Sequence, residues 1–564
     1  MEIERRSHLD IAHQLRFGSP AVLFSNHDPK NDRVEGVISY QGGDRLKINL
    51  FTEELPDWSR DGKLGVELLF DDNTYDDMNA ALKLADSMSE DRRIQVLTGL
   101  KAPAFAPEID LPLNGLNSSQ QAAVRKIIAA HDLAIVHGPP GTGKTTTLVQ
   151  AIKLMAANEQ VLVVAPSNTA VDLLSEKLAQ EGLNILRIGN PARVSERLMS
   201  LTLDSQMAEH SYMKESKKLK KQASEYKNMA HKYKRNFGKA ERDQRKALFD
   251  EAHKIMKEVA KTEQFIIDDL VNKAQVITAT LAGANNWTVK AQKFNTVVID
   301  EAGQALEPAC WIPILKAQKV ILAGDHCQLP PTIKSSTAAK SGLNTTLLEK
   351  CIALYPQAVV LLNEQYRMNE AIMGYSSKVF YNNELKAHSS VATRLLFEGD
   401  SPLSFIDTAG CGFEEKQIGT SVANPEEAAF LFKYLEAFVT GIGPFPTIAI
   451  ISPYREQIRL LKEQLANAPT LQQFLDYISV NTIDSFQGQE RDMVLISMTR
   501  SNSEGEIGFL SDIRRMNVAM TRAKKKLVVI GDSATLTRLP FYAGMITYAE
   551  DLGAYKSAWE YSFL

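Results

Sequence analysis

Residues 138–145 read Gly-Pro-Pro-Gly-Thr-Gly-Lys-Thr and follow the apolar run 133–136, with only His137 between them. A glycine, four residues and then Gly-Lys-Thr after a strand are typical of a loop whose backbone N–H groups surround a phosphate. Lys144 then reaches the β- and γ-phosphates, and the Thr145 hydroxyl binds Mg²⁺. The alternative is a chance glycine-rich turn, which the helix-like run 145–155 disfavours. The predicted nucleotide contacts are Gly138, Pro139, Pro140, Gly141, Thr142, Gly143, Lys144, Thr145 and Thr146.

Two carboxylates, Asp300 and Glu301, follow another apolar strand, 295–299. A carboxylate at the tip of a strand beside the phosphate-loop strand can hold Mg²⁺ through water, and its neighbour can take a proton from the attacking water. We therefore predict that Asp300 is the metal residue and Glu301 the general base. The alternative is that the two carboxylates end a strand and only face solvent. This alternative is disfavoured because a phosphate-binding loop needs an acidic partner.

Three polar side chains further along the chain can complete this phosphate chemistry. Gln328 lies in the segment 324–331, after an apolar strand, where it is placed to sense the γ-phosphate or to orient water. Arg367 and Arg522 lie in a later α/β segment that has no phosphate loop of its own. An arginine that reaches a γ-phosphate across a cleft accelerates transfer by roughly 10³–10⁵. A single arginine is more often a surface charge, so the prediction depends on finding two.

The elements that must position these residues fall into several parts. A short helix is expected over 1–18, and β-type runs between 21 and 70 indicate a small β-barrel or a strongly curled sheet. Helical spacing returns over 73–100. Strands alternate with helices over 116–204 and 271–342, and again from about 345 to 564, which predicts two α/β lobes. The predicted domains are 1–110, 111–342 and 343–564, with second-lobe strands at 358–362, 447–452, 493–498 and 526–531.

A polar stretch, 205–270, interrupts the first lobe. Its apolar residues step by four and three, which predicts an antiparallel two-helix hairpin with one apolar seam and a turn near Gly238. The stretch carries 16 Lys/Arg and 11 Asp/Glu, an excess that suits either a partner-binding surface or a plainly solvated hairpin. The seam residues are Leu219, Ala223, Tyr226, Ala230, Tyr233, Phe237, Leu248, Ala252, Ile255, Val259 and Ile266.

The composition limits the class of protein. The chain has 564 residues, of which 44% are hydrophobic and 23% charged, and a net charge of −4, so it is expected to be globular with more than one domain. No apolar run approaches the ~20 residues of a membrane span, and the first ten residues lack the apolar region of a secretory signal. The four cysteines show no CxxC spacing, so we expect reduced thiols, a cytoplasmic location and no zinc site.

Read in order, these strings resemble the motifs of the superfamily 1 helicases. Three further strings, 387–392, 407–412 and 505–517, resemble the up-frameshift-like branch, and within it the immunoglobulin mu-binding-protein and DNA polymerase alpha-associated helicases. The resemblance covers about residues 110–540. The matching segments are 116–120 for the Q-motif, 138–145 for motif I, 300–304 for motif II, 324–331 for motif III, 363–368 for motif IV, 480–490 for motif V and 515–523 for motif VI.

The resemblance implies an α/β fold of two tandem RecA-like lobes with ATP between them, a small N-terminal β-barrel and a helical-hairpin insertion over the nucleic-acid channel. It implies that Gln120 and Tyr366 contact the adenine and that Glu490 contacts the ribose. It also makes Arg367 and Arg522 the arginines that cross between the lobes. Since the ligands of one phosphate would then lie on two bodies, ATP is expected to close the cleft and hydrolysis to open it.

The same resemblance implies which strand ends face a single strand of DNA or RNA. Small hydroxyls and backbone amides at strand ends bind phosphates without reading bases. Tyr454 is expected to stack on a base, with a packed core aromatic as the alternative. The implied contacts are Pro166, Ser167, Asn168, Thr280, Pro453, Tyr454, Thr482, Asp484 and Arg500.

These observations together predict an ATP- and Mg²⁺-dependent helicase or translocase that moves 5′→3′ on single-stranded DNA or RNA. The direction comes from the resemblance, and a monomer is expected because both halves of the ATP site lie in one chain. An ATP-gated nucleic-acid clamp or ribonucleoprotein remodeller with little unwinding is the alternative, because the barrel segment is short. A P-loop nucleotide kinase is disfavoured, since it needs no second lobe with two arginine motifs.

Overall fold

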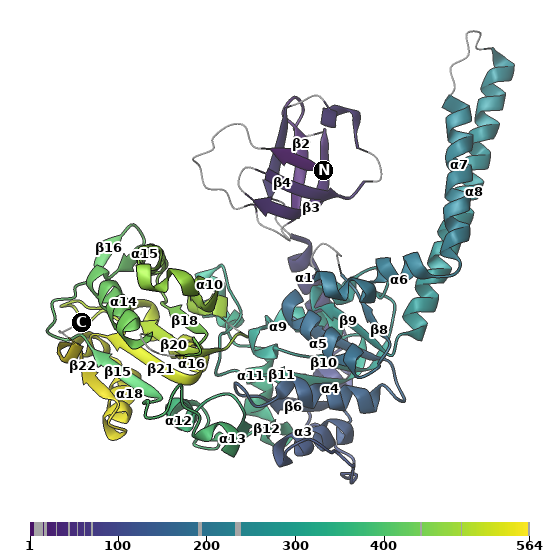
Figure 1. Ribbon diagram of the computed structural model, residues 1–564. Coiled ribbons are helices and arrows are strands. Elements are labelled where there is room, and N and C mark those ends of the chain that lie inside the picture. The colour runs from purple at the N-terminus through teal and green to yellow at the C-terminus, as the bar shows by residue number, and fades with distance from the viewer. Residues whose placement is uncertain are drawn as a thin grey trace.

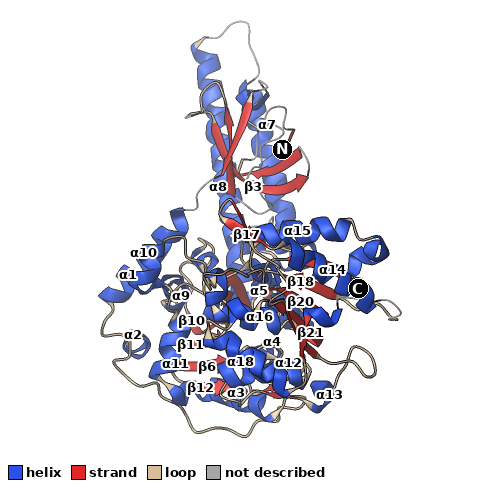
Figure 2. Ribbon diagram, turned by 90° about the vertical axis from the view of Figure 1, so that its left-hand side faces the viewer, coloured by secondary structure: helices blue, strands red, loops and turns tan. Residues whose placement is uncertain are grey.

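The protein consists of two α/β lobes that lie side by side, with a small β-domain and a long helical hairpin that both rise from the first lobe (Figures 1 and 2). The computed structural model describes residues 1–4, 15, 20–29, 31–42, 45–52, 55–60, 63–68, 72–189, 194–231, 238–439, 443–486 and 488–561. Each lobe is built on a parallel sheet, which confirms the predicted two-lobed α/β fold.

The N-terminal domain is a curled antiparallel sheet of five strands in the order β1-β4-β3-β2-β5. The helix expected over 1–18 is wrong at its start, because residues 2–4 form an edge strand that pairs with β4. Of residues 5–19 only Leu15 is described, so the rest of that prediction lies outside the described residues. The elements are β1 (Glu2–Glu4), β2 (Pro20–Ser25), β3 (Arg33–Gly42), β4 (Arg45–Leu50) and β5 (Leu64–Leu68), followed by α1 (Asp72–Ser87) and α2 (Arg92–Leu97).

The first lobe contains a seven-stranded parallel sheet in the order β12-β6-β11-β10-β7-β9-β8. Its strands are almost entirely buried because helices cover both faces, as in other parallel sheets. The strands are β6 (Leu133–His137), β7 (Val161–Ala165), β8 (Ile185–Arg187), β9 (Val276–Thr280), β10 (Phe294–Ile299), β11 (Ala317–Gly324) and β12 (Val359–Leu361). The helices are α3 (Ser118–Ala129), α4 (Lys144–Met155), α5 (Asn168–Gln180), α9 (Glu307–Ile314), α10 (Ser336–Ala338) and α11 (Leu347–Leu354).

One predicted strand belongs to the other lobe. The run 358–362 was expected in the second sheet, but β12 pairs in parallel with β6, the strand that leads into the phosphate loop, with Val359 opposite Ile135. Helix α11, which precedes it, also packs into the core of the first lobe through Leu347 and Leu348. A short apolar run indicates a buried strand whichever sheet it joins, so only the pairing decides.

The stretch 205–270 forms the expected hairpin of two long helices, α7 (Met213–His231) and α8 (Lys239–Lys273), after the short α6 (Leu203–Glu209). Ala223 and Ala230 of α7 and Ala252 and Val259 of α8 are buried, as the predicted seam requires. Gly238 is the N-cap residue of α8. Residues 232–237, which include the seam residues Tyr233 and Phe237, lie outside the described residues. Within the described ranges no helix is both long enough and apolar enough to cross a membrane.

The second lobe contains a six-stranded parallel sheet in the order β19-β18-β20-β21-β15-β22. Two small sheets, β13 with β14 and β16 with β17, flank it. The strands are β13 (Glu364–Gln365), β14 (Lys386–Ala387), β15 (Leu403–Asp407), β16 (Lys416–Ile418), β17 (Ser421–Ala423), β18 (Ile448–Ile451), β19 (Ile478–Asn481), β20 (Arg491–Ser497), β21 (Ala523–Gly531) and β22 (Tyr555–Ser557). The helices are α12 (Glu370–Phe380), α13 (Ser389–Ala392), α14 (Pro425–Val439), α15 (Arg455–Ala466), α16 (Ile513–Met520), α17 (Ser533–Leu536) and α18 (Pro540–Asp551).

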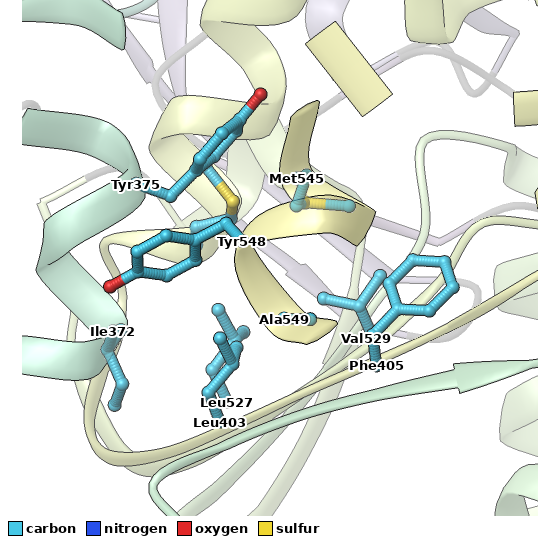
Figure 3. Close-up of a pocket in the computed structure, with 10 residues that line it drawn as sticks. Ile372, Tyr375, Leu403, Phe405, Leu527, Val529, Met545, Tyr548 and Ala549 are labelled. Atoms are coloured by element: carbon cyan, nitrogen blue, oxygen red, sulfur yellow. The ribbon is translucent and has the colours of Figure 1, made fainter. Parts of the chain in front are cut away.

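The core of the second lobe holds a cavity of about 10 Å³ between the sheet and helices α12 and α18 (Figure 3). The side chains around it are apolar except for the hydroxyls of Tyr375 and Tyr548. Both hydroxyls already donate hydrogen bonds, Tyr375 to the Phe541 carbonyl and Tyr548 to the Ala371 carbonyl. The cavity is therefore a small packing defect, with no polar group left to hold a ligand.

The second lobe also buries a carboxyl group that should make its stability depend on pH. Glu427 of α14 is fully buried, and burial raises its pKa from 4.5 to about 7. Because the folded state holds this proton more tightly than the unfolded chain, the group favours folding below pH 4.5, and this contribution is lost as pH rises through about 7. The loss amounts to about 3 kcal/mol.

We therefore expect Glu427→Gln to raise the melting temperature relative to the parent protein at pH 8, with a smaller difference at pH 5. Thermal melts of both proteins at the two pH values measure this. Glu426→Gln is the matched control on the same helix, since the Glu426 side chain is 42% exposed. A difference between Glu427→Gln and the parent that does not change with pH would contradict the expectation.

Candidate functional site

The predicted phosphate loop joins β6 to α4 and depends on glycine at two positions. Gly141 and Gly143 have φ values of 77° and 75°, in the left-handed region that favours glycine. A Cβ on Gly141 would lie 2.7 Å from the Cβ of Arg367, and one on Gly143 would lie 2.5 Å from Nε2 of Gln120. The loop is thus in close contact with two other residues of the predicted site, and any larger residue would displace them.

Lys144, the first residue of α4, lies between the two predicted carboxylates. Its Nζ donates to Oδ1 of Asp300 at 2.7 Å and to Oε1 of Glu301 at 2.5 Å. Burial alone would lower the pKa of Lys144, but the charges of Asp300 and Glu301 outweigh it and raise the pKa above its ordinary value. The sheet therefore brings together three residues that the sequence predicted separately, the lysine, the predicted metal residue Asp300 and the predicted base Glu301.

Gln304 holds the predicted base and was missed by sequence reasoning. Its Nε2 donates to Oε2 of Glu301 at 2.8 Å, so both carboxylate oxygens of Glu301 have a donor. Glu301 itself has a φ of 53°, which is uncommon outside glycine and turns the chain sharply at the end of β10. The position of Gln304 within the segment 300–304 was the available signal.

Arg522 is the more buried of the two predicted cross-lobe arginines, with 2% of its surface exposed. Its four hydrogen-bond acceptors in the described part of the chain are all uncharged oxygens. One of them is Oε1 of Gln328 in the first lobe, at 3.4 Å. Burial, with help from the charge of Arg367, lowers the pKa of Arg522 to about 9. The charges of Glu301 and Glu490 act on it from a distance, and an anion bound between the lobes would supply a counter-charge in direct contact.

Arg367 lies against the phosphate loop and contacts another predicted residue. Its Nε donates to Oε2 of Glu490 at 2.7 Å, and its Nη1 donates to the Thr521 carbonyl at 3.1 Å. The preceding residue, Tyr366, donates its backbone N–H to the Gly141 carbonyl at 2.8 Å. Gln365 fixes this turn, because its fully buried Oε1 accepts from the backbone N–H of Arg367 at 2.7 Å. Gln365 lay inside a recognised motif without being singled out.

The two predicted adenine contacts, Gln120 and Tyr366, are linked through Asn117. Gln120 donates from Nε2 to the Thr142 carbonyl at 3.0 Å and accepts the Asn117 backbone N–H at 3.0 Å, as part of the capping box that starts α3. Asn117 Nδ2 donates to the Tyr366 hydroxyl at 3.0 Å. The Tyr366 ring packs 4.7 Å from the ring of His388, a residue that sequence reasoning had not assigned.

A buried hydrogen-bond network behind the phosphate loop was also missed. Asp325 accepts from His137 Nε2 at 3.0 Å and from the Tyr381 hydroxyl at 2.7 Å. Gln328 Nε2 donates to the same carboxylate at 2.8 Å. Burial alone would raise the pKa of Asp325, yet these hydrogen bonds lower it. Since Tyr381 belongs to the second lobe, the network connects both lobes to Gln328 and, through it, to Arg522.

The cysteine next to this network, Cys327, is a free thiol. His326 and Cys327, with His137 and Asp325, bring potential metal-ligand atoms within 4.8 Å of one another. Both oxygens of Asp325 already accept hydrogen bonds from protein donors, including the Cys327 backbone N–H at 3.0 Å. The hydrogen bonds to Asp325 therefore explain why these four side chains lie close together. All four cysteines of the chain, Cys310, Cys327, Cys351 and Cys411, are free.

The predicted nucleic-acid contacts of the first lobe lie together at the carboxyl ends of β7 and β9. Ser167 is exposed and caps α5, while Pro166 is half-buried beside it. Asn168 is held in place by the fully buried Arg187, whose Nη2 donates to Oδ1 of Asn168 at 2.8 Å. Thr280 ends β9, and its hydroxyl accepts the Gly283 backbone N–H at 3.0 Å.

The predicted contacts of the second lobe divide into accessible and covered residues. Pro453 and Thr482 are half-buried, and Asp484 is exposed and forms an ion pair with Arg515 at 3.4 Å. Arg500 is only 6% exposed and is paired with Glu415 at 2.9 Å, so its charge is already neutralised.

Tyr454 corrects one expectation. Its ring is 3% exposed, with the Arg500 guanidinium 6.0 Å from its centre and the Phe509 ring 5.7 Å away. Its hydroxyl accepts the Phe509 backbone N–H at 3.2 Å. In this arrangement the ring has no free face for a base, and the packed-aromatic alternative describes it.

Two parallel-sheet lobes, a phosphate loop in one, and arginines of the other that contact this loop and Gln328 define a two-lobed P-loop NTPase. Family models described as "AAA domain" match residues 115–336 and 343–534. The chain belongs to the superfamily 1 helicases, in their up-frameshift-like branch.

Three relatives illustrate this membership. The chain is 36% identical to DNA-binding protein SMUBP-2 of Rattus norvegicus over 97% of this chain, and it spans 58% of that protein's length. It is 31% identical to an uncharacterized ATP-dependent helicase of Methanocaldococcus jannaschii, over 94% of this chain and 85% of the relative. It is 35% identical to DNA polymerase alpha-associated DNA helicase A of Saccharomyces cerevisiae, over 82% of this chain and 73% of the relative.

Proposed function

We propose that this protein is an ATP-dependent helicase or translocase that moves 5′→3′ on single-stranded DNA or RNA and hydrolyses ATP between its two lobes. The observation that carries the proposal is that both lobes contribute to one site. Lys144 lies between Asp300 and Glu301 in the first lobe. From the second lobe, Arg367 packs against the phosphate loop at Gly141 and Arg522 donates to Gln328. The names of the relatives, a DNA-binding protein and two helicases, support both the ATP dependence and the nucleic-acid substrate.

Within this proposal, each part of the site has a role in hydrolysis. The backbone of 138–143 and Lys144 bind the phosphates, and Glu301 takes the proton of the attacking water. Thr145 and Asp300 are the residues that would hold Mg²⁺, which suits their oxygen ligands and, when bound, neutralises phosphate charge. Gln120 and Tyr366 bind the adenine, and Glu490 binds the ribose.

The proposed motor step follows from the division of phosphate ligands between two bodies. Arg367 and Arg522 move with the second lobe, so a γ-phosphate that both lobes bind favours a closed cleft. Gln328 contacts Arg522 and also donates to Asp325, whose other partners include Tyr381 of the second lobe. Loss of the γ-phosphate removes the shared ligand, and the lobes can then part while each holds the strand separately.

The strand contacts in this proposal are those that lie at accessible strand ends, Pro166, Ser167 and Thr280 of the first lobe and Pro453 and Thr482 of the second. Three other predicted contacts, Asp484, Asn168 and Arg500, are already bonded to protein side chains, so in this proposal they position neighbouring residues rather than bind the strand directly.

We expect a monomer, since one chain supplies both halves of the ATP site. The four free cysteines favour a reducing compartment such as the cytoplasm.

The first experiment measures the steady-state ATPase rate of the full chain against single-stranded DNA and single-stranded RNA separately, across a salt series. We expect strong stimulation by single strands and an affinity that falls as salt rises, because phosphate contacts release counterions. Hydrolysis that no single strand stimulates would rule out a nucleic-acid-driven motor.

A second experiment tests direction and unwinding with duplexes that carry either a 5′ or a 3′ single-stranded tail. The proposal expects ATP-dependent separation of the 5′-tailed duplex only. Separation of the 3′-tailed duplex alone would reverse the direction. ATP-dependent tight binding without separation of either duplex would instead identify an ATP-gated clamp.

A further inference from the structure

A groove of about 880 Å³ opens between the N-terminal sheet, the base of the helical hairpin and the outer edge of the first lobe. Leu50 and Phe51, at the end of β4, form one wall, and Met207 of α6 and Ile267 of α8 form another. Trp287, in the connection between β9 and β10, also lines the groove. Both views of the molecule show the N-terminal sheet and the hairpin rising from the same side of the lobe (Figures 1 and 2).

Two large aromatic side chains in this groove are left open to solvent. Trp287 is 65% exposed and Phe51 is 62% exposed, and they come from segments far apart in the sequence. Two exposed aromatic rings in one concave site indicate a ligand that covers them.

The charge of the groove indicates what kind of ligand this is. Among the described residues that line it, none is a lysine or an arginine. Of its two carboxylates, Glu263 is paired with Lys220 at 3.0 Å, and Asp204 lies in the first turn of α6. The lining therefore suits a neutral flat ring rather than a phosphate, since a phosphate would need cationic partners.

The sheet topology makes the groove continuous with the proposed strand path. The carboxyl ends of parallel strands lie at one edge of a sheet, and β7, β9 and β8 are neighbours in that order. Ser167 follows β7 and Thr280 ends β9, while Gly189 of the groove follows β8. A strand that passes Ser167 and Thr280 toward the outside of the first lobe therefore reaches this groove next.

We propose that the groove is a subsite for one nucleobase of the single strand, in which Trp287 stacks on the base and Phe51 closes the side of the N-terminal sheet. The inference rests on the proposed function and names a contact that the family motifs do not contain. Aromatic stacking is tolerant of base sequence because every base has a π-face. This subsite therefore adds affinity for the single strand without adding sequence specificity.

The test uses the intrinsic tryptophan fluorescence of the full chain during titration with oligo(dT) and, separately, oligo(U). A base stacked on an indole quenches its emission, so quenching is expected in the parent. Trp287→Phe should remove most of the quenching with little change in affinity, because phenylalanine still offers a ring. Trp559→Phe is the matched control, since Trp559 is 61% exposed but lies in the second lobe, and it should keep the quenching.

The affinity arm uses Trp287→Ala, which should raise the Kd for the oligonucleotide about 5- to 150-fold, the equivalent of the ~1–3 kcal/mol of one stacked base. If the parent binds oligonucleotide but Trp287→Phe keeps the quenching and Trp287→Ala keeps the affinity, the subsite is wrong and the proposed function stands. If the parent binds no single strand at all, both the nucleobase subsite and the proposed function are wrong.

Discussion

Replacing Arg522 by alanine should lower the nucleic-acid-stimulated kcat for ATP hydrolysis by about 10³–10⁵-fold. The guanidinium is buried between the lobes, and its four described acceptors are uncharged, so its charge is available to a phosphate. In the transition state, the transferred phosphoryl group spreads negative charge over its oxygens. A preorganised cation in a buried site stabilises that charge most. The measurement is the steady-state rate at saturating single strand.

Controls separate this catalytic effect from a loss of structure, because Arg522 also donates to the Val518 carbonyl at 2.9 Å. Binding of a non-hydrolysable ATP analogue should change far less than kcat, and the melting temperature of the variant shows whether it is folded. Arg522→Lys keeps the charge but loses the fork of donors and should recover only part of the rate. Arg459→Ala, on the exposed face of α15, is the matched control. A kcat close to that of the parent in a folded Arg522→Ala protein would remove Arg522 from the reaction.

Glu301→Gln should reduce kcat by about 10²–10⁴-fold while ATP binding is retained. The carboxylate lies at the end of β10, accepts from Lys144 at 2.5 Å and from Gln304 at 2.8 Å, and is thereby held in one orientation. An amide has almost the same shape and still accepts one of these hydrogen bonds, but it cannot take a proton from water at neutral pH. Single-turnover hydrolysis of pre-bound ATP measures the chemical step directly.

Lys144→Ala distinguishes loss of the base from loss of phosphate binding. It removes the cation that lies between Asp300 and Glu301, so it should weaken ATP binding as well as hydrolysis. Glu301→Gln should instead leave the protein bound to ATP and to the single strand, because binding no longer leads to turnover. Equal losses of ATP affinity in the two variants would show that Glu301 binds phosphate or metal rather than acting as the base.

The sequence predicted the contacts of the candidate ATP site more completely than those of the candidate strand-binding site. Gly141, Lys144 and Asp300 lie in short strings whose chemistry depends on neighbours a few residues away, and the structure brings them together as expected. Gln304 and Gln365 lay inside recognised motifs, but nothing in their local pattern said that one holds Glu301 and the other holds Arg367. His137 and Tyr381 carried no signal, because their shared partner Asp325 is distant from both in the sequence.

Two predictions, the lobe assigned to the strand 358–362 and the stacking of Tyr454 on a base, were wrong because both depend on contacts between distant segments. The run 358–362 has the apolar pattern of a buried strand, which any sheet can accept, and it joined the first lobe through β6. Tyr454 follows a strand end in the second lobe, where an aromatic ring can either stack on a base or pack inward. The contacts of Arg500 and Phe509 with its ring decide for inward packing.

By itself, the sequence determined the phosphate loop, its acidic partners, the two α/β lobes and the helical hairpin, because spacing and periodicity are properties of short segments. Only the tertiary structure decided which lobe β12 belongs to, that Arg522 lies against Gln328, and that Tyr454 is covered. It also brought Trp287 and Phe51 into one groove. Such contacts join segments that are far apart in the chain, and they follow from how whole elements pack rather than from any local pattern of residues.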